Sequence, residues 1–189
     1  MKAIVYSHSA LAEFFETEQP KPEPQGYDLQ VQIKAISVNP VDCKIHKNVR
    51  PEKGEEKILG WDAAGIVTAV GEKASEYRVG DKVYYAGDLT RQGCNAEYQC
   101  VDERIVGKMP KSLSFSEAAA LPLTSITAWE LLFDRLGLSD SSGSSDEVLM
   151  VTGAAGGVGS ILVQLAKSMT DATVIGTASR AEGQAWVKS

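Results

Sequence analysis

The chain has 189 residues and a formal net charge of −6, long enough for one large domain or two small ones. No cluster of lysine and arginine indicates a nucleic-acid partner, and no apolar run approaches the length of a membrane span. Three cysteines form no obvious disulfide framework, and the first residues lack the apolar core of a signal peptide. We therefore expect a cytoplasmic protein without nucleic-acid or membrane partners.

Short strand-like segments dominate the chain from Met1 to about Pro122. Residues 29–36 alternate apolar and polar side chains, as a half-buried strand does. Turn signals separate this segment from the other predicted strands, which cover residues 1–6, 65–71, 83–85 and 96–101. Several short strands with frequent turns favour a barrel-like, mostly antiparallel domain.

Helical patterns begin near Ser116. Residues 114–117 offer capping residues, and a short helical segment from Ala118 to Leu121 follows. The next helix, residues 124–136, carries apolar residues that we interpret as a core-facing stripe: Ile126, Trp129, Leu132 and Phe133. Polar residues 139–146 then predict a surface loop in the second domain.

The most informative stretch follows this loop. Residues 148–152 form an apolar run suited to a buried parallel strand, residues 160–169 show helical spacing, and residues 173–178 predict a second strand. A glycine-rich turn joins the first strand to the helix. This order is typical of the opening of a dinucleotide-binding unit, where backbone N–H groups and a helix N-terminus bind a pyrophosphate.

The glycine-rich turn supplies the candidate cofactor-binding residues. Gly153, Gly156 and Gly159 are spaced by three, a variant of the usual glycine pattern. The residues that we expect to hold the pyrophosphate are Gly153, Ala154, Gly156, Gly157, Val158 and Gly159. A tight turn without a ligand is the alternative, since glycine loops occur in many turns.

The end of the second strand bears on the choice of cofactor. Sites that prefer NAD carry an acidic residue there, but this chain has Ser179 and Arg180 and no acid until Glu182. Arg180 could pair with a 2′-phosphate, so we predict NADP(H), with Ser179 and Arg180 as contacts. An ordinary surface cation is the alternative for Arg180.

Several further segments carry a family resemblance. Together with the glycine turn, the chain resembles the medium-chain dehydrogenase/reductase superfamily, in its zinc-free quinone oxidoreductase branch, through residues 37–42, 59–65, 79–84, 118–124 and 127–129. The resemblance implies an α/β fold with a mainly β part. A GroES-like barrel at residues 1–122 would precede the start of a Rossmann domain at residues 123–189. Members of this family are nearly twice as long, so we expect a C-terminally truncated chain.

The resemblance also implies catalytic and metal-binding features. Asn39 and Asp42 would line a cleft near the nicotinamide, and Thr127 would contact the cofactor. Asn39-Pro40 is also a common turn start and Asp42 could cap a helix. The proton donor stays unidentified, with His46 as a conceivable candidate.

Zinc is not expected. Zinc-dependent relatives carry Gly-His-Glu and a cysteine where this chain has Gly60-Trp61-Asp62 and Asn39, so a histidine and a cysteine ligand are missing. In the region of the structural zinc, this chain has two cysteines, Cys94 and Cys100, in place of four closely spaced ones.

These features lead to two functional hypotheses. The first is an NADPH-dependent, zinc-independent oxidoreductase that transfers hydride to a quinone or an α,β-unsaturated carbonyl compound, a small-molecule substrate. The second is an NADPH-binding redox sensor or structural protein without turnover. Family analogy suggests a homodimer, and the activity of the shortened chain alone is an open question.

Overall fold

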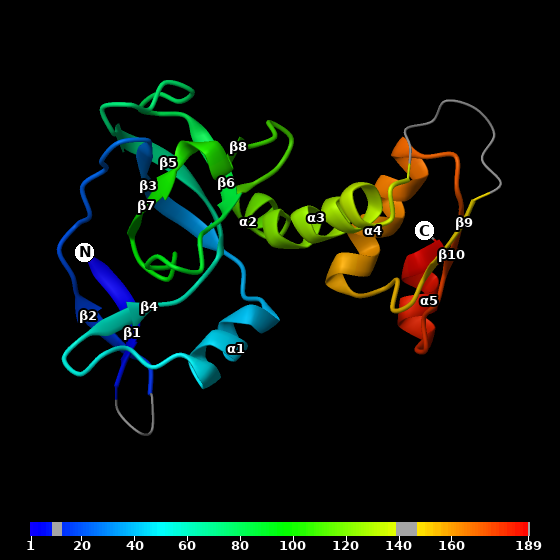
Figure 1. Cartoon of the computed structure of the whole chain (residues 1–189), viewed down its shortest axis with the longest axis horizontal. Helices are drawn as coiled ribbons and strands as arrows, with labels where there is room; N and C mark the ends of the chain where they lie inside the picture. Colours follow the sequence, from blue (N-terminus) through cyan, green and yellow to red (C-terminus); the bar gives the residue numbers. More distant parts are fainter. Residues whose placement is uncertain (9–12, 139–146, 189) are drawn as a thin grey trace. The chain divides into compact units, whose positions relative to one another are not determined.

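The computed structural model describes residues 1–8, 13–138 and 147–188 of the chain. It divides into two compact units, Met1–Leu123 and Thr124–Ser189 (Figure 1). The loop predicted at residues 139–146 lies outside the described residues. Within the described part, no helix is both long enough and apolar enough to cross a lipid bilayer.

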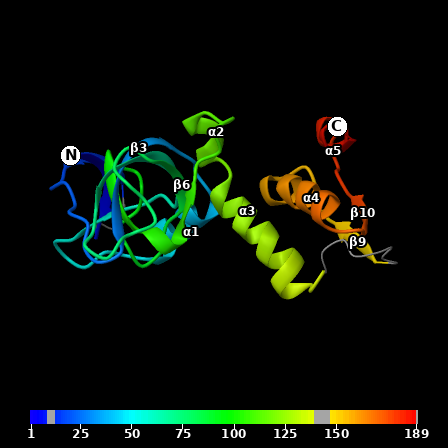
Figure 2. The same ribbon diagram turned by 90° about the horizontal axis from the view of Figure 1, so that it is seen from above.

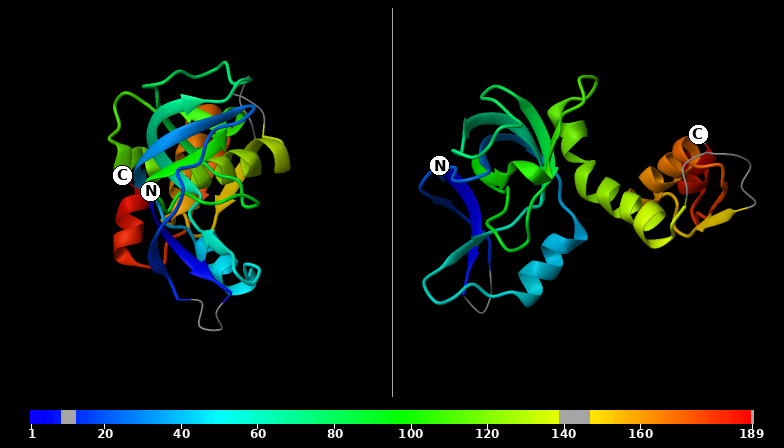
Figure 3. Two further views of the ribbon diagram at one scale, coloured as in Figure 1. Left: turned by 90° about the vertical axis from the view of Figure 1, so that its left-hand side faces the viewer. Right: turned by 45° about the horizontal axis from the view of Figure 1, so that its top comes forward.

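The first unit is built on a five-stranded antiparallel sheet that curves on itself (Figure 3). The strand order is β7-β3-β5-β6-β8, and every neighbouring pair is antiparallel. The strand bounds are β3 (Asp28–Ile36), β5 (Asp62–Val70), β6 (Lys82–Ala86), β7 (Tyr98–Asp102) and β8 (Val106–Lys108). The predicted strands at residues 29–36, 65–71, 83–85 and 96–101 are therefore confirmed.

A second, three-stranded sheet lies in the same unit. Its order is β2-β1-β4, with β1 (Lys2–Ser7) between β2 (Phe15–Glu18) and β4 (Glu56–Ile58). The predicted strand at residues 1–6 is confirmed as β1. Strands β2, β4 and β8 were not predicted, because each has only three or four residues and too few alternations to show a pattern.

The core of the first unit follows from the alternation along its strands. Leu29 and Val31 of β3 point to one side, where they join Val67, Val83 and Val101 from neighbouring strands, and all five are buried. Period-two alternation sends these side chains inward from each strand. Residues 37–42 follow β3 and residues 60–61 precede β5, so both segments lie at the same end of this antiparallel pair.

Within the described residues of the first unit, two α-helices and a short 3-10 helix, Glu103–Ile105, lie wholly in that unit. Helix α2 (Phe115–Ala119) begins within the predicted capping segment, residues 114–117. The Glu117 N–H donates to Ser114 Oγ and the Ser114 N–H donates to the Glu117 carboxylate. Helix α1 (Pro40–Asn48) was foreseen only through the alternative that Asp42 caps a helix. Pro40 occupies its first turn, where the missing N–H costs nothing, so the turn signal of Asn39-Pro40 is in fact a helix start.

The second unit contains the predicted βαβ arrangement (Figure 2). Strands β9 (Val148–Val151) and β10 (Thr173–Gly176) pair in parallel, and α4 (Gly157–Met169) connects them. Helix α5 (Ala181–Lys188) follows β10. Helix α3 (Pro122–Trp129), whose first two residues belong to the first unit, continues into a π-helical segment, Glu130–Arg135.

The core of the second unit is small. Ala128, Leu132, Leu162 and Ala166 from the helices pack with Val151 of β9. The predicted core-facing stripe is wrong for Ile126 and Trp129, which are 47% and 46% exposed. Helical spacing identifies an apolar side but not its buried width, and here the neighbouring row through Ala128 and Leu132 faces the core.

Candidate functional site

The glycine turn lies between β9 and the first turn of α4. Gly153 has φ = 71°, in the left-handed region that glycine adopts without a side-chain clash. The Gly156 N–H donates to the Gly153 carbonyl at 2.9 Å, which closes the turn. Helix α4 then starts at Gly157, as a dinucleotide-binding turn requires.

Close packing explains the third glycine. A Cβ atom at Gly159 would lie 2.4 Å from the Gly153 carbonyl oxygen and 2.7 Å from Ala154 Cα. No side chain fits there without moving the backbone. At Gly157, by contrast, the nearest atom to a Cβ would be Thr124 Cγ2, at an ordinary 3.4 Å.

The turn is tied to the end of β10, which leaves some of its amides available. The Gly153 N–H donates to Thr177 Oγ1 at 3.2 Å, and the Ala154 N–H donates to the Thr177 carbonyl at 3.0 Å. These two N–H groups are therefore used in hydrogen bonds within the protein and are not available to a ligand. The first N–H groups of α4, from Gly157 to Gly159, have no intrahelical acceptor and form an electropositive helix end.

The structure brings Ser179 and Arg180 together with this turn. A pocket of about 490 Å³ is lined by Gly153, Ala155, Gly156, Ala178, Ser179, Arg180, Glu182, Gly183 and Trp186. Arg180 is exposed just before α5 and belongs to none of the ion pairs within the described residues. The pocket therefore places a guanidinium, a group that binds phosphates, beside the glycine turn. Ala154, Gly157, Val158 and Gly159, the other residues predicted to hold the pyrophosphate, do not line it.

Thr127 does not line this pocket. It lies on α3 and is exposed, three residues beyond Thr124. Since Thr124 Cγ2 is near Gly157, the beginning of α3 lies beside the beginning of α4 within the second unit.

Asn39 and Asp42 lie next to each other at the start of α1. The Asn39 N–H donates to Asp42 Oδ2 at 2.7 Å, so Asp42 caps the helix from its first turn, as the structural alternative stated. Both residues are buried, with 8% and 7% exposure. The capping interaction accounts for one Asp42 oxygen and fixes the main chain at Asn39.

Asp62 completes this cluster, although the sequence did not single it out as a site residue. The Asn39 Nδ2 group donates to Asp62 Oδ2 at 2.8 Å, and the Leu123 N–H donates to Asp62 Oδ1 at 2.8 Å. Burial raises the pKa of Asp62 to about 6, while the two hydrogen bonds oppose the rise. The sequence pointed to Asp62 only through its place beside Trp61. Its partners, Asn39 and Leu123, lie too far away along the chain to be inferred from that segment.

The residues at the position of the catalytic zinc do not fit that metal. Trp61 is buried and donates its indole N–H to the Asp88 carbonyl, and Asn39 is engaged with Asp62. Across residues 1–8, 13–138 and 147–188, no group of three or more His, Cys, Asp or Glu side chains is placed to hold a metal ion. Zinc independence stays a prediction, based on the identity of these side chains.

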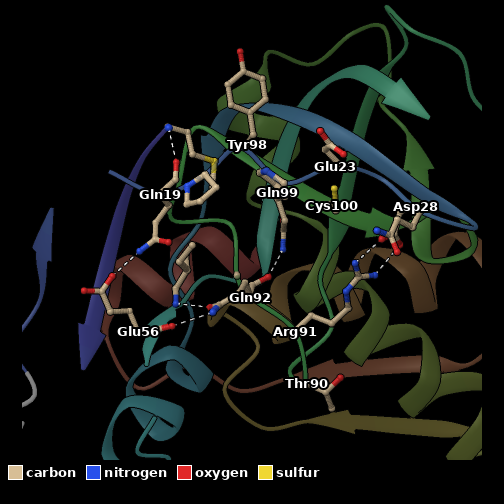
Figure 4. Close-up of a pocket in the computed structure, with 16 residues that line it drawn as sticks. Gln19, Glu23, Asp28, Glu56, Thr90, Arg91, Gln92, Tyr98, Gln99 and Cys100 are labelled. Carbon is tan, nitrogen blue, oxygen red and sulfur yellow. Dashed lines mark hydrogen bonds and ion pairs between the residues drawn. The ribbon is translucent and has the colours of Figure 1, made fainter. Parts of the chain in front are cut away.

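A different pocket of about 600 Å³ lies in the first unit (Figure 4). The Arg91 guanidinium donates to both oxygens of Asp28, at 2.8 and 2.7 Å, and the Gln99 amide donates to the Gln92 carbonyl. Burial raises the pKa of Cys100 in this pocket to about 11, so its thiol is protonated at neutral pH. Since these polar groups already pair with each other, we assign no ligand here.

Comparison with known proteins agrees with this architecture. Residues 25–111 match the model of the alcohol dehydrogenase GroES-like domain. A zinc-type alcohol dehydrogenase-like protein from Staphylococcus epidermidis is 40% identical, covering 98% of this chain and 56% of that protein. A 2-methylene-furan-3-one reductase from tomato, Solanum lycopersicum, is 37% identical, covering 95% of this chain and 47% of that protein. The chain thus spans about half the length of these curated relatives.

Solved structures agree as well. A Rhizobium etli protein, whose name places it provisionally among zinc-dependent alcohol dehydrogenases, is 52% identical with a TM-score of 0.90, covering 100% of this chain and 56% of that one. A Pseudomonas syringae quinone oxidoreductase is 30% identical with a TM-score of 0.80, covering 99% and 55%. A mycobacterial protein complexed with NADPH is 28% identical with a TM-score of 0.81, covering 100% and 56%.

A GroES-like domain followed by a βαβ unit with a glycine turn defines a class of two-part α/β proteins. The chain belongs to the medium-chain dehydrogenase/reductase superfamily. The predicted fold class is thereby confirmed.

Proposed function

We propose that this chain carries the catalytic part and the NADP(H)-binding turn of a zinc-independent oxidoreductase that reduces quinones or α,β-unsaturated carbonyl compounds. The observation that carries this proposal is the pocket in which the glycine turn and Arg180 meet. The names of the tomato reductase, the P. syringae quinone oxidoreductase and the NADPH complex support the substrate class and the cofactor.

The turn has the features needed to hold a dinucleotide. The N–H groups of Gly157, Val158 and Gly159 would donate to the diphosphate, because α4 leaves them without intrahelical acceptors. Arg180 would pair with the 2′-phosphate, assisted by Ser179. Glu182 lines the same pocket, but it lies two residues beyond Arg180, inside α5.

Hydride transfer is the chemistry that a bound nicotinamide supplies. The chain itself would bind the cofactor, orient the substrate and polarise its carbonyl group. Asn39 has an amide that can donate to a substrate carbonyl or a ribose hydroxyl, and no metal would be needed for that role. Asp42 would act through Asn39, because its carboxylate holds the Asn39 main chain at the start of α1.

Absorbance at the NADPH band tests the proposal. Purified chain, mixed with NADPH and either phenanthrenequinone or a simple enone, is expected to oxidise NADPH, and NADH should be used less well. Tight NADPH binding without oxidation of NADPH by either substrate would favour the sensor hypothesis. Neither binding nor turnover would contradict the proposal.

A further inference from the structure

Asp62 has a buried carboxylate to which the proposed reaction assigns no role. It is fully buried at the start of β5, beside Trp61 and Ala63, which are 1% and 0% exposed. Within the part of the chain that the structure describes, the ion pairs do not include Asp62. Burying an ionised carboxylate costs free energy unless hydrogen bonds stabilise it. The hydrogen-bond partners of Asp62 therefore indicate what the residue does.

The two oxygens of Asp62 bind elements that are distant in sequence. Oδ2 accepts from Asn39 Nδ2 directly before α1, and Oδ1 accepts from the Leu123 N–H in the first turn of α3, both at 2.8 Å. The main-chain carbonyl of Asp62 accepts from the Ser37 N–H at 3.0 Å. One side chain therefore connects the starts of two helices to the sheet.

This arrangement decides which way the Asn39 amide faces. A side-chain amide presents a donor on one side and an acceptor on the other, and rotation by half a turn exchanges them. The Asp62 carboxylate can only accept when ionised, so it holds the Nδ2 side toward itself. One Nδ2 hydrogen is used in this bond, and the second hydrogen stays in a fixed direction.

We propose that Asp62 is a positioning residue for the proposed reaction, which orients the Asn39 amide and holds the first turn of α3. This inference rests on the proposed function for its catalytic consequence, but not for the hydrogen bonds themselves. Loss of the carboxylate charge would weaken both bonds together.

The charge of Asp62 responds to pH near neutrality. Burial and the charge of Asp42 on α1 raise its pKa to about 6, against the effect of its two hydrogen bonds. Cys94 also faces it and donates its thiol to the Asp62 carbonyl at 3.3 Å; burial raises the pKa of that thiol to about 12, so it stays neutral. On the same helix as Asp42, His46 packs against Tyr6 at a ring-centroid distance of 4.9 Å.

NMR of the whole chain tests the hydrogen bonds directly. In the wild type, we expect the Asp62 Cγ signal, the Asn39 side-chain amide and the Leu123 N–H to shift with one shared midpoint near pH 6. In Asp62→Asn, the Asn39 and Leu123 signals should no longer titrate there. Should Asp62→Asn fail to fold, the wild-type titration decides alone: no shared midpoint between pH 5 and 8 overturns the inference.

Glu103→Gln is the matched control. Glu103 is also a buried acid, 4% exposed, and its carboxylate accepts the N–H groups of Ser75 and Glu76 away from this cluster. The control is expected to keep the Asn39 and Leu123 titrations. If it removed them as Asp62→Asn does, the effect would be general to buried acids and the inference would be wrong.

The catalytic consequence has its own measurement. For NADPH oxidation with phenanthrenequinone, kcat/KM of the wild type and of Glu103→Gln should fall in acid with a midpoint near pH 6, while Asp62→Asn should be at least tenfold slower at pH 7.5 and flat with pH. An unchanged pH profile in Asp62→Asn would overturn the positioning role. A wild type without turnover would refute the proposed function instead. The NMR titration would then still test whether Asp62 forms its hydrogen bonds to Asn39 and Leu123.

Discussion

Arg180 is the residue on which the cofactor choice depends. It lies in the pocket beside the glycine turn and is exposed, so a 2′-phosphate could reach it. A charge-assisted hydrogen bond contributes roughly 1.5–3 kcal/mol. We expect Arg180→Ala to weaken NADPH binding by roughly 10- to 150-fold and to leave NADH binding nearly unchanged, as measured by calorimetric titration.

Arg135→Ala is the control for this substitution, because Arg135 is an exposed arginine of the same unit that does not line the pocket. It should bind NADPH as the wild type does. Equal loss in both variants would assign the effect to overall charge, and no loss in either would make Arg180 an ordinary surface cation.

Asp62 makes stability depend on pH in an unusual direction. Its pKa is raised from 3.8 to about 6 in the folded chain, so the folded state binds more protons than the unfolded state between these values. Its contribution to stability is full below pH 4 and is lost as the pH rises through 6, by up to about 3 kcal/mol. Between pH 7 and 5, urea unfolding should show the wild type gaining stability relative to Asp62→Asn. A difference that is constant over this range would contradict the raised pKa.

At the scale of residues, the sequence predicts which residues belong to the site better than it predicts which residues they contact. Asn39 and Asp42 were selected as a pair, and they do lie together, but three residues of separation make that contact local. Asp62 joins residues 39 and 123, and only the folded sheet and helices bring those together. Its significance could not be read from a short window of sequence.

Among the elements, the glycine turn allows two similar substitutions, Gly159→Ala and Gly157→Ala, to be compared. Gly159→Ala would place a Cβ atom 2.4 Å from the Gly153 carbonyl oxygen, so α4 must move away from the turn. We expect a loss of roughly 1–3 kcal/mol in stability and a loss of NADPH binding. Thermal unfolding and cofactor titration measure the two effects.

Gly157→Ala is the matched control for stability, since its Cβ atom would meet Thr124 Cγ2 at 3.4 Å. Alanine at this exposed helix position should leave the stability unchanged or raise it by up to about 1 kcal/mol. If both substitutions destabilised the chain equally, close packing would not be the reason for the third glycine.

The success of prediction for an element depended on its length and on local signals. The βαβ unit was predicted because an apolar run, a glycine turn and helical spacing follow each other directly. Helix α1 was missed because Asn39-Pro40 is equally typical of a turn, and the helix has only nine residues with a weak apolar side. The π-helical segment Glu130–Arg135 has no sequence signature that distinguishes it from an α-helix.

For the whole molecule, the two units should differ in stability. The first has two sheets around several buried clusters, whereas the second exposes one face of its two-stranded sheet through Val148, Met150 and Ile175. We expect hydrogen exchange to be faster in β9 and β10 than in β3 and β5, because fewer contacts oppose local opening. Protection in β9 and β10 equal to that in β3 and β5 would show that the second unit is better stabilised than its packing indicates.

We infer that the glycine turn and Arg180 together bind NADP(H). Calorimetric titration of the wild-type chain with NADPH and, separately, with NADH tests it most directly. We expect saturable binding of NADPH at least tenfold tighter than that of NADH. Equal affinity for the two cofactors would contradict the role of Arg180, and no binding of either would contradict the claim itself.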